Sequence, residues 1–231
     1  MMHAAIFQKL DNPAWYALSE THQPFATGSN TLKRYQKEIV SFIAYDHAEK
    51  NALSELDRLT DVEESFFIIG NFPPIPSNYN IDSRLSCVQM VCFTLTNPPA
   101  FNAMIEQLEQ NDEQQMLALI NLVQPGYFLP GTRMMGDYYG IRQDRELVAV
   151  TGERMRMDGL TEISAVVTHP GFTGRKYAQQ LVAHVANKNM EAGIIPFLHV
   201  DESNERAIGI YQRLGFSRRR IIDFWKIRRM G

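Results

Sequence analysis

The feature that most constrains this sequence is one step from a strand through a glycine loop into a helix, within residues 162–179 (EISAVVTHPGFTGRKYAQ). A β-branched apolar run ends at a Pro-Gly turn, and an amphipathic helical pattern starts just after Gly174. Such a step presents free backbone N–H groups at the positive end of a helix dipole, which favours an anion such as a pyrophosphate. Two glycines in a loop are common, so an ordinary turn is the alternative on composition alone.

The segments around this step predict a layered α/β sheet. Short polar turns join three β-like runs, as in hairpins, and a helix then alternates with a strand. The predicted elements are strands at 138–142, 147–156 and 161–168, a helix at 175–192, a strand at 194–200, a helix at 204–214, and a closing strand pair at 216–219 and 221–227.

The first part of the chain has a different character, with helical patterns near 12–20 and 48–59 and strands at 65–69 and 85–95. Three prolines within residues 73–76 predict a loop, because proline cannot join a central sheet. A break at Asn97-Pro98-Pro99 precedes two more predicted helices, at 101–109 and 113–122. We therefore predict an α+β region of unknown role over residues 1–97 and a second domain over 98–231.

Composition excludes several classes of protein. The net charge is −3 over 231 residues, so no strong field attracts nucleic acid or an anionic membrane. No apolar run approaches the ~18 residues of a membrane span, and no secretion signal is visible, so we expect a cytoplasmic protein. Cys87 and Cys92 would point to opposite faces of one strand, which disfavours both a disulfide and a metal site.

A family resemblance adds to this local interpretation. VVTHP followed by Thr173–Ala178 resembles the acyl-CoA-binding motif Q/R-x-x-G-x-G/A of the GNAT superfamily of N-acetyltransferases, and NERAIGIYQRLGF at 204–216 is similar to its N-x-x-A-x-x-x-Y-x-x-x-G-F helix. The resemblance covers about residues 98–228. It implies the GNAT fold, a mixed and mostly antiparallel sheet flanked by helices, with acetyl-CoA as cosubstrate and no metal.

The same resemblance implies which residues bind the cosubstrate. The pantetheine arm would pair with the strand edge, the pyrophosphate would lie on the loop, and a polar helix residue would contact the arm. The strand edge is Val166, Val167 and Thr168, and the helix residue is Asn204. The loop residues are Thr173, Gly174, Arg175, Lys176, Tyr177 and Ala178. Thr173 and Lys176 depart from the family pattern, which usually has Arg or Gln at the first position and Gly at the fourth. Main-chain N–H groups remain at both positions, and Lys176 either narrows the approach or offers a cation.

Two side chains are the predicted catalytic residues. Tyr211 stands at the family's tyrosine position, where a phenol can protonate the departing thiolate; the alternative is helix packing. Glu162 lies on the binding strand, where some superfamily members place a general base; the alternative is an ion pair with Arg154 or Arg156. Glu153 is a weaker candidate base, and the pattern does not decide whether His199 faces the core or the cleft.

The resemblance thus predicts direct transfer of an acetyl group from acetyl-CoA to a primary amine, on a small molecule or a peptide. The acceptor residues would come from residues 101–132 and from the N-terminal part. A binding module of the same fold, weak or inactive in catalysis, is the alternative, and a homodimer is left open. A dinucleotide-binding Rossmann domain is disfavoured, since no G-x-G-x-x-G loop follows an early strand.

Overall fold

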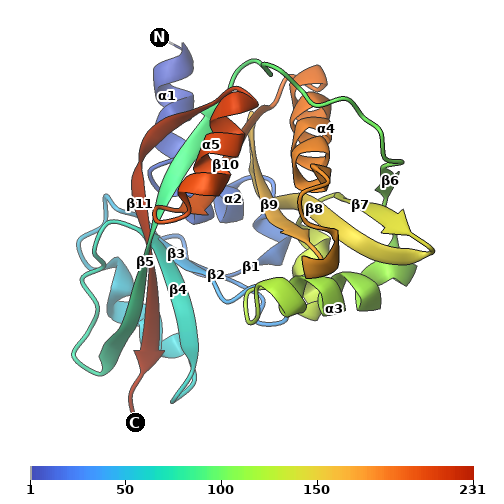
Figure 1. Cartoon of the computed structure of the whole chain (residues 1–231). Helices are drawn as coiled ribbons and strands as arrows, with labels where there is room; N and C mark the ends of the chain where they lie inside the picture. The colour runs from blue at the N-terminus through green and yellow to red at the C-terminus, as the bar shows by residue number, and fades with distance from the viewer. Residues whose placement is uncertain (1) are drawn as a thin grey trace.

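One eight-stranded sheet forms the centre of the molecule, in the order β4-β11-β5-β10-β9-β8-β7-β6 (Figure 1). The computed structural model describes the backbone of residues 2–231 and the side chains from Ile6 onward. The strands are β4 (Ser65–Gly70), β5 (Tyr79–Cys92), β6 (Glu106–Gln107), β7 (Tyr138–Gln143), β8 (Glu146–Met157), β9 (Leu160–Thr168), β10 (Ile195–Asp201) and β11 (Phe216–Arg229). Among the described strands of this sheet, only β9 and β10 run parallel, so the predicted mixed and mostly antiparallel sheet is confirmed.

Helices cover both faces of this sheet (Figure 1). One face carries α4 (Tyr177–Glu191) and α5 (Glu205–Arg213), and the other carries α2 (Pro13–Ser19), α3 (Glu113–Val123) and a small sheet. The remaining elements are α1 (Met2–Lys9), β1 (Ala26–Gly28), β2 (Leu32–Tyr35), β3 (Ile43–Tyr45) and the 3-10 turns Gln23–Phe25, Ala52–Arg58, Gln110–Asp112, Pro130–Met135 and Pro170–Phe172. Strand alternation divides the core residues between the two faces. Cys92 packs with α4, whereas Cys87 packs on the opposite side with α2, as the spacing predicted.

The N-terminal part supplies a central strand of the sheet. β5 is hydrogen-bonded to β10 on one side and to β11 on the other. The predicted closing strand pair is wrong: β11 is one continuous strand with a bulge near Arg218, because β5 takes the place that a second closing strand would need. Residues on both sides of position 97 therefore share one sheet. The division into domains at residue 97 stays a prediction.

Two other segments differ from their predicted conformation. Residues 101–109 form no helix but an extended stretch ending in β6, since the N–H groups of Asn102 and Ala103 donate to the buried amide oxygen of Gln180 on α4. Residues 48–59 contain a 3-10 turn, Ala52–Arg58, rather than an α-helix. The proline-rich loop, the two hairpins and the helix ending at Gly193 (φ +73°) are as predicted.

The sheet opens between its two parallel strands. Pairing of β9 with β10 runs from Leu160–Ile195 to Ile163–Leu198, and neither strand pairs with the other beyond that point. β9 continues to pair with β8 after a bulge, at which Ala165 has a positive φ of +51°. A bulge bends its strand and increases the local twist. The bend of β9 away from β10 leaves one backbone edge of Val166–Thr168 without a strand partner.

Candidate active site

Two cavities open on either side of α5. The first, of about 350 Å³, is lined by the loop before α4 and by one stripe of α5, namely Arg206, Ile210 and Arg213. The second, of about 550 Å³, reaches into the opening between β9 and β10 and is lined by a neighbouring stripe, Asn204, Ala207 and Tyr211. Both stripes follow the three- and four-residue spacing of one helix face. One short helix therefore borders both cavities.

The loop of the first cavity has the properties of an anion site. Gly174 has φ +82° and open space where a Cβ would stand. Gln180 N donates to Lys176 O, and the amides of Tyr177, Ala178 and Gln179 in the first turn precede any intrahelical acceptor. These amides lie at the positive end of the 15-residue helix α4. These properties favour an anion such as a diphosphate at this end of the cavity.

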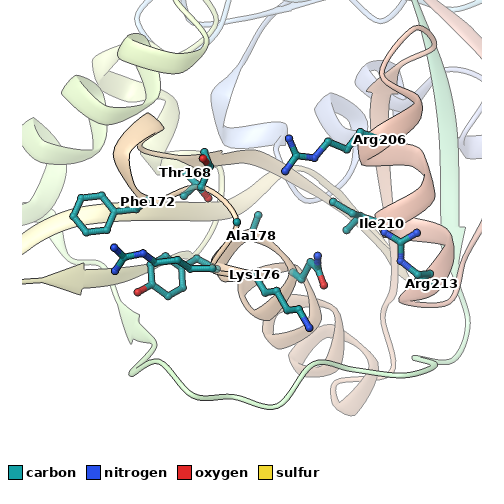
Figure 2. A pocket seen from close by; sticks show the side chains of 12 residues that line it. Thr168, Phe172, Lys176, Ala178, Arg206, Ile210 and Arg213 are labelled. Atoms are coloured by element: carbon teal, nitrogen blue, oxygen red, sulfur yellow. The ribbon is translucent and has the colours of Figure 1, made fainter.

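Four cations surround this loop. Figure 2 shows Lys176 on the loop side and Arg206 and Arg213 on α5, across the first cavity from it. Within the described part of the chain, none of the three forms an ion pair with a carboxylate. Arg175 stacks over the Phe172 ring at 4.8 Å. An incoming phosphate would thus meet positive charge that no carboxylate has neutralised.

Lys176 occupies the left-handed conformation that the family's usual glycine suits best. Its φ is +62° and ψ +17°, at the N-cap of α4, and its side chain makes no capping hydrogen bond. A lysine adopts this conformation at some cost, because its Cβ approaches the backbone. Its side chain nevertheless lines the first cavity without closing it.

The predicted strand edge borders both cavities. Val166 lines the second cavity and Thr168 lines the first. The Val167 side chain is buried on the opposite face, beside α3. Val167 would contribute to a ligand site through its backbone only.

The predicted helix residues both line the second cavity. The Asn204 side-chain oxygen accepts from Ala207 N at 3.0 Å, which caps α5, and the residue also lines the cavity. Tyr211 is buried, and burial raises its pKa to about 12. No described residue accepts or donates a hydrogen bond at its hydroxyl group. Cys87 lines the same cavity, and burial raises its thiol pKa to about 12.

Glu162 is engaged in a buried ion pair. Its carboxylate accepts from Arg154 Nε at 2.8 Å and Nη2 at 2.6 Å, and from His199 Nδ1 at 2.7 Å. Burial alone would raise the pKa of Glu162, but Arg154 and His199 outweigh it and lower the pKa to about 2. Such a carboxylate is a poor proton acceptor at neutral pH. The geometry favours the cross-strand ion pair over the role of general base.

The ion pair continues into a chain of buried polar groups. Gln89 on β5 donates through Nε2 to His199 Nε2 at 3.0 Å and to Leu10 O at 2.8 Å, while its Oε1 accepts from Arg219 at 2.8 Å. Arg219 fixes the orientation of this amide, so His199 carries its proton on Nδ1, toward Glu162. The two alternatives for His199 are therefore not exclusive: its side chain is buried with both ring nitrogens hydrogen-bonded, and it also lines the second cavity.

Glu153, the weaker candidate base, lies elsewhere. It accepts from Asn189 Nδ2 at 3.0 Å and from Asp137 N at 3.2 Å, and it lines neither cavity. Within the described residues, no group of three or more His, Cys, Asp or Glu side chains is arranged to hold a metal ion. Nor is any described helix both long and apolar enough to cross a membrane.

Sequence reasoning expected acceptor residues from residues 101–132 and from the N-terminal part, but it named no individual side chain for this wall of the second cavity. Phe42, Phe67, Leu85 and Cys87, all from the N-terminal part, line it together with residues 120–128. A parallel bridge from Phe42 to Phe67 joins the small sheet to β4. The strand patterns around these residues were visible in the sequence, but nothing local indicated that the strands would pair beside β10.

The comparisons with known proteins agree with this geometry. The model of the family described as FR47-like protein matches residues 138–225. No curated protein is significantly similar to the chain. A solved structure from Novosphingobium aromaticivorans, assigned to the GNAT family of acetyltransferases, has 29% identity and a TM-score of 0.87 and covers 96% of this chain and 99% of its own.

Two more distant structures share the fold over nearly the whole chain. A GCN5-related N-acetyltransferase from Kribbella flavida has 18% identity and a TM-score of 0.59, covering 94% of this chain and 96% of its own. A GCN5-related N-acetyltransferase-like protein from Streptococcus suis has 11% identity and a TM-score of 0.60, covering 97% and 98%. The FR47-like match and the full-length likeness at 29% identity confirm the predicted resemblance to the GNAT acetyltransferases and identify the chain as an acyltransferase.

Proposed function

We propose that this acyltransferase moves an acetyl group from acetyl-CoA directly to the primary amine of an acceptor bound in the second cavity. The observation that carries the proposal is the opening between β9 and β10, bordered on one side by a helix start with free amides and on the other by a cavity of about 550 Å³. When bound, acetyl-CoA would supply the activated thioester carbonyl.

Binding and orientation would fall to the backbone. The first-turn amides of α4, with Arg206 and Arg213, would hold the diphosphate, and the free edge of Val166–Thr168 would pair with the amides of the pantetheine arm. Both ends of the cosubstrate would then be fixed relative to the second cavity. Such fixing lowers the barrier by removing translational and rotational freedom before the reaction.

Tyr211 is the group that we propose as proton donor to the leaving thiolate. Its hydroxyl is free of protein hydrogen bonds among the described residues and borders the second cavity. Burial raises the pKa of Tyr211 to about 12. A leaving thiolate buried beside it would likewise be a stronger base than in water, which favours proton transfer from the phenol.

The acceptor amine must lose a proton, and Glu162 is unsuited to take it. Exposed residues, among them Gln124, Pro125 and Tyr127, line part of the second cavity, so it opens to solvent. We propose that the amine enters as the free base and that water accepts the proton released in the reaction. The rate should accordingly rise with pH through the acceptor's own pKa, with no inflection from Glu162 between pH 5 and 8.

The test combines calorimetry with acetyl-CoA and an assay of thiol release with a panel of amines. We expect saturable binding of acetyl-CoA and amine-dependent thiol release. The engaged state of Glu162 favours a second candidate, a CoA-binding module without transfer. Binding without thiol release for any amine would favour that module, and absence of binding would contradict both.

A further inference from the structure

We infer that the acceptor is an α-amino amide with an aromatic side chain, the chemistry shared by an aromatic amino acid amide and by a peptide that begins with an aromatic residue. This inference rests on the N-acetyltransferase function proposed above and identifies the substrate class of the second cavity. It is carried by the aromatic wall of that cavity, the buried ion pair of Arg154 with Glu162, and one free hydrogen-bond donor.

Aromatic side chains form much of the cavity wall. Besides Tyr211 on α5, they come from five separate segments of the chain and are Phe42, Phe67, Tyr127, Phe128, Tyr138 and Phe224. Phe67 meets Phe42 edge to face at 6.3 Å and faces Tyr127 at 5.9 Å with an interplanar angle of 35°. Phe67 is half-buried and Tyr127 is 48% exposed, so an incoming ring meets these two at the mouth. Such a surface favours a flat apolar group.

The buried charge in the cavity is already balanced. Arg154 and Asp201 are the only Lys, Arg, Asp or Glu residues among its described lining. The Arg154 guanidinium is paired side-on with Glu162, whereas Asp201 is exposed and accepts only from the backbone and hydroxyl of Ser203, at 2.8 and 2.7 Å. An ammonium or a phosphate placed beside the Arg154–Glu162 pair would therefore be buried without a matching charge, which is costly. A phosphorylated amine fits this part of the cavity poorly.

One nitrogen of Arg154 is free. Nε and Nη2 bond to Glu162, whereas Nη1 has no hydrogen-bond partner among the described residues and is not enclosed by protein. Arg154 lines the cavity, its guanidinium carbon lying 5.1 Å from the Phe42 ring centre and 5.8 Å from that of Phe224. Nη1 thus offers a donor between aromatic rings.

A neutral carbonyl oxygen matches this donor best. A carboxylate would place a second anion on a guanidinium whose charge Glu162 already balances. A carbonyl accepts the hydrogen bond without adding charge, and a group that lacks an oxygen leaves the donor unsatisfied. An amine next to an aromatic side chain and an amide carbonyl meets all three conditions.

The experiment compares amines in the thiol-release assay, with products checked by mass spectrometry. We expect kcat/KM for phenylalaninamide to exceed that for phenethylamine about tenfold, since only the former satisfies Arg154 Nη1. Alaninamide, free phenylalanine and spermidine should be weaker still. A preference for spermidine, or equal rates for alaninamide and phenylalaninamide, would overturn the inference. A dipeptide amide that begins with phenylalanine distinguishes peptide from small-molecule acceptors.

Binding of phenylalaninamide to the CoA-loaded protein, followed by saturation-transfer NMR, separates this inference from the proposed function. Binding without turnover would contradict acetyl transfer but keep the assignment of the cavity. Turnover of other amines without binding of phenylalaninamide would contradict the inferred substrate class but would agree with acetyl transfer. Binding of neither CoA nor phenylalaninamide would contradict both.

A charge placed at the cavity mouth provides a second test. Tyr127→Asp at this half-exposed site should lower kcat/KM for phenylalaninamide about tenfold, by loss of the aromatic contact, and raise it for lysinamide. Val62→Asp is the matched control, because Val62 is exposed and lines neither cavity. If the two variants act alike on both amides, the cavity mouth does not select the acceptor.

Discussion

The loop before α4 and the polar chain beneath the second cavity both concentrate charge, but one leaves it unpaired and the other pairs it completely. Around the loop, Lys176, Arg206 and Arg213 lack carboxylate partners among the described residues, and the first-turn amides lack intrahelical acceptors. In the chain, the Glu162 carboxylate accepts three side-chain bonds, from Arg154 and His199. Charges without a counter-charge near the surface are suited to bind a charged ligand, whereas a buried ion pair holds the structure and leaves only the Arg154 Nη1 donor for a neutral group.

The strongest test of this contrast is Glu162→Gln, which leaves Arg154 buried without a counter-charge. We expect a loss of about 3–5 kcal/mol in the free energy of unfolding, the usual cost of removing one partner of a buried pair. Urea denaturation measures it. Glu202→Gln, at an exposed position that lines neither cavity, is the matched control.

Acid denaturation checks the same ion pair without a mutation. The folded pKa of Glu162, about 2, lies below its ordinary 4.5, so the stabilisation is complete above pH 4.5 and is lost as the pH falls toward 2. Glu162→Gln should flatten this part of the pH profile. A variant as stable as the native protein but devoid of activity would instead restore Glu162 as the base.

Tyr211→Phe tests a group that is neither an unpaired surface charge nor part of the buried ion pair. The Tyr211 hydroxyl is buried but has no hydrogen-bond partner among the described residues. We expect kcat to fall about a hundredfold, as for the loss of a general acid, with stability nearly unchanged because no protein hydrogen bond is lost. Steady-state kinetics and a thermal melt measure the two effects. Tyr45→Phe, at another buried tyrosine that lines neither cavity, controls for the loss of a hydroxyl. Full turnover in Tyr211→Phe would remove the proposed acid.

Arg206→Glu tests the unpaired side of the contrast. The KM for acetyl-CoA should rise about tenfold or more, because hydrogen bonds to charged groups contribute ~1.5–3 kcal/mol, and the effect should shrink in high salt. Stability should change little, since Arg206 has no ion pair to lose among the described residues. Arg218→Glu, at an exposed position on β11 that lines neither cavity, should leave the KM unchanged.

The smallest effect is expected at Lys176. Lys176→Gly should stabilise the protein by about 1 kcal/mol, because glycine adopts the left-handed conformation without strain. Lys176→Ala removes the ammonium but keeps the strain, so a KM increase shared by both variants reports the charge alone. A melting temperature that is equal in the two variants would show that the backbone is unstrained there.

The parts that could be predicted from the sequence depend on local chemistry. The strand, glycine loop and helix start at 162–179 follow from residues within one short segment, as does the cap of α5 by Asn204. The missed parts depend on partners far away in the chain. The insertion of β5 between β10 and β11 involves pairs such as Ser86 and Asp223, 137 positions apart.

From the sequence, the ion pair of Glu162 with an arginine was only one of two alternatives, the other being the role of general base. Neighbouring strands put Arg154 within reach, but the sequence could not indicate that Gln89 would complete the chain from β5. The extended path of residues 101–109 likewise depends on Gln180, on a helix that begins some 70 residues later. Hydrophobic periodicity reports the conformation that a segment favours by itself. It does not report the contacts with distant residues that can override this preference.

The position of β5 also has a consequence for biosynthesis. The ribosome synthesises β5 long before β10 and β11. At ~5–20 residues per second, both edges of β5 stay unpaired for on the order of ten seconds, until the neighbouring strands have been made. During that interval the nascent chain exposes an apolar strand that invites pairing with other chains. A product that terminates early would lack β11 and leave one edge of β5 bare, so only a completed polypeptide can close its sheet.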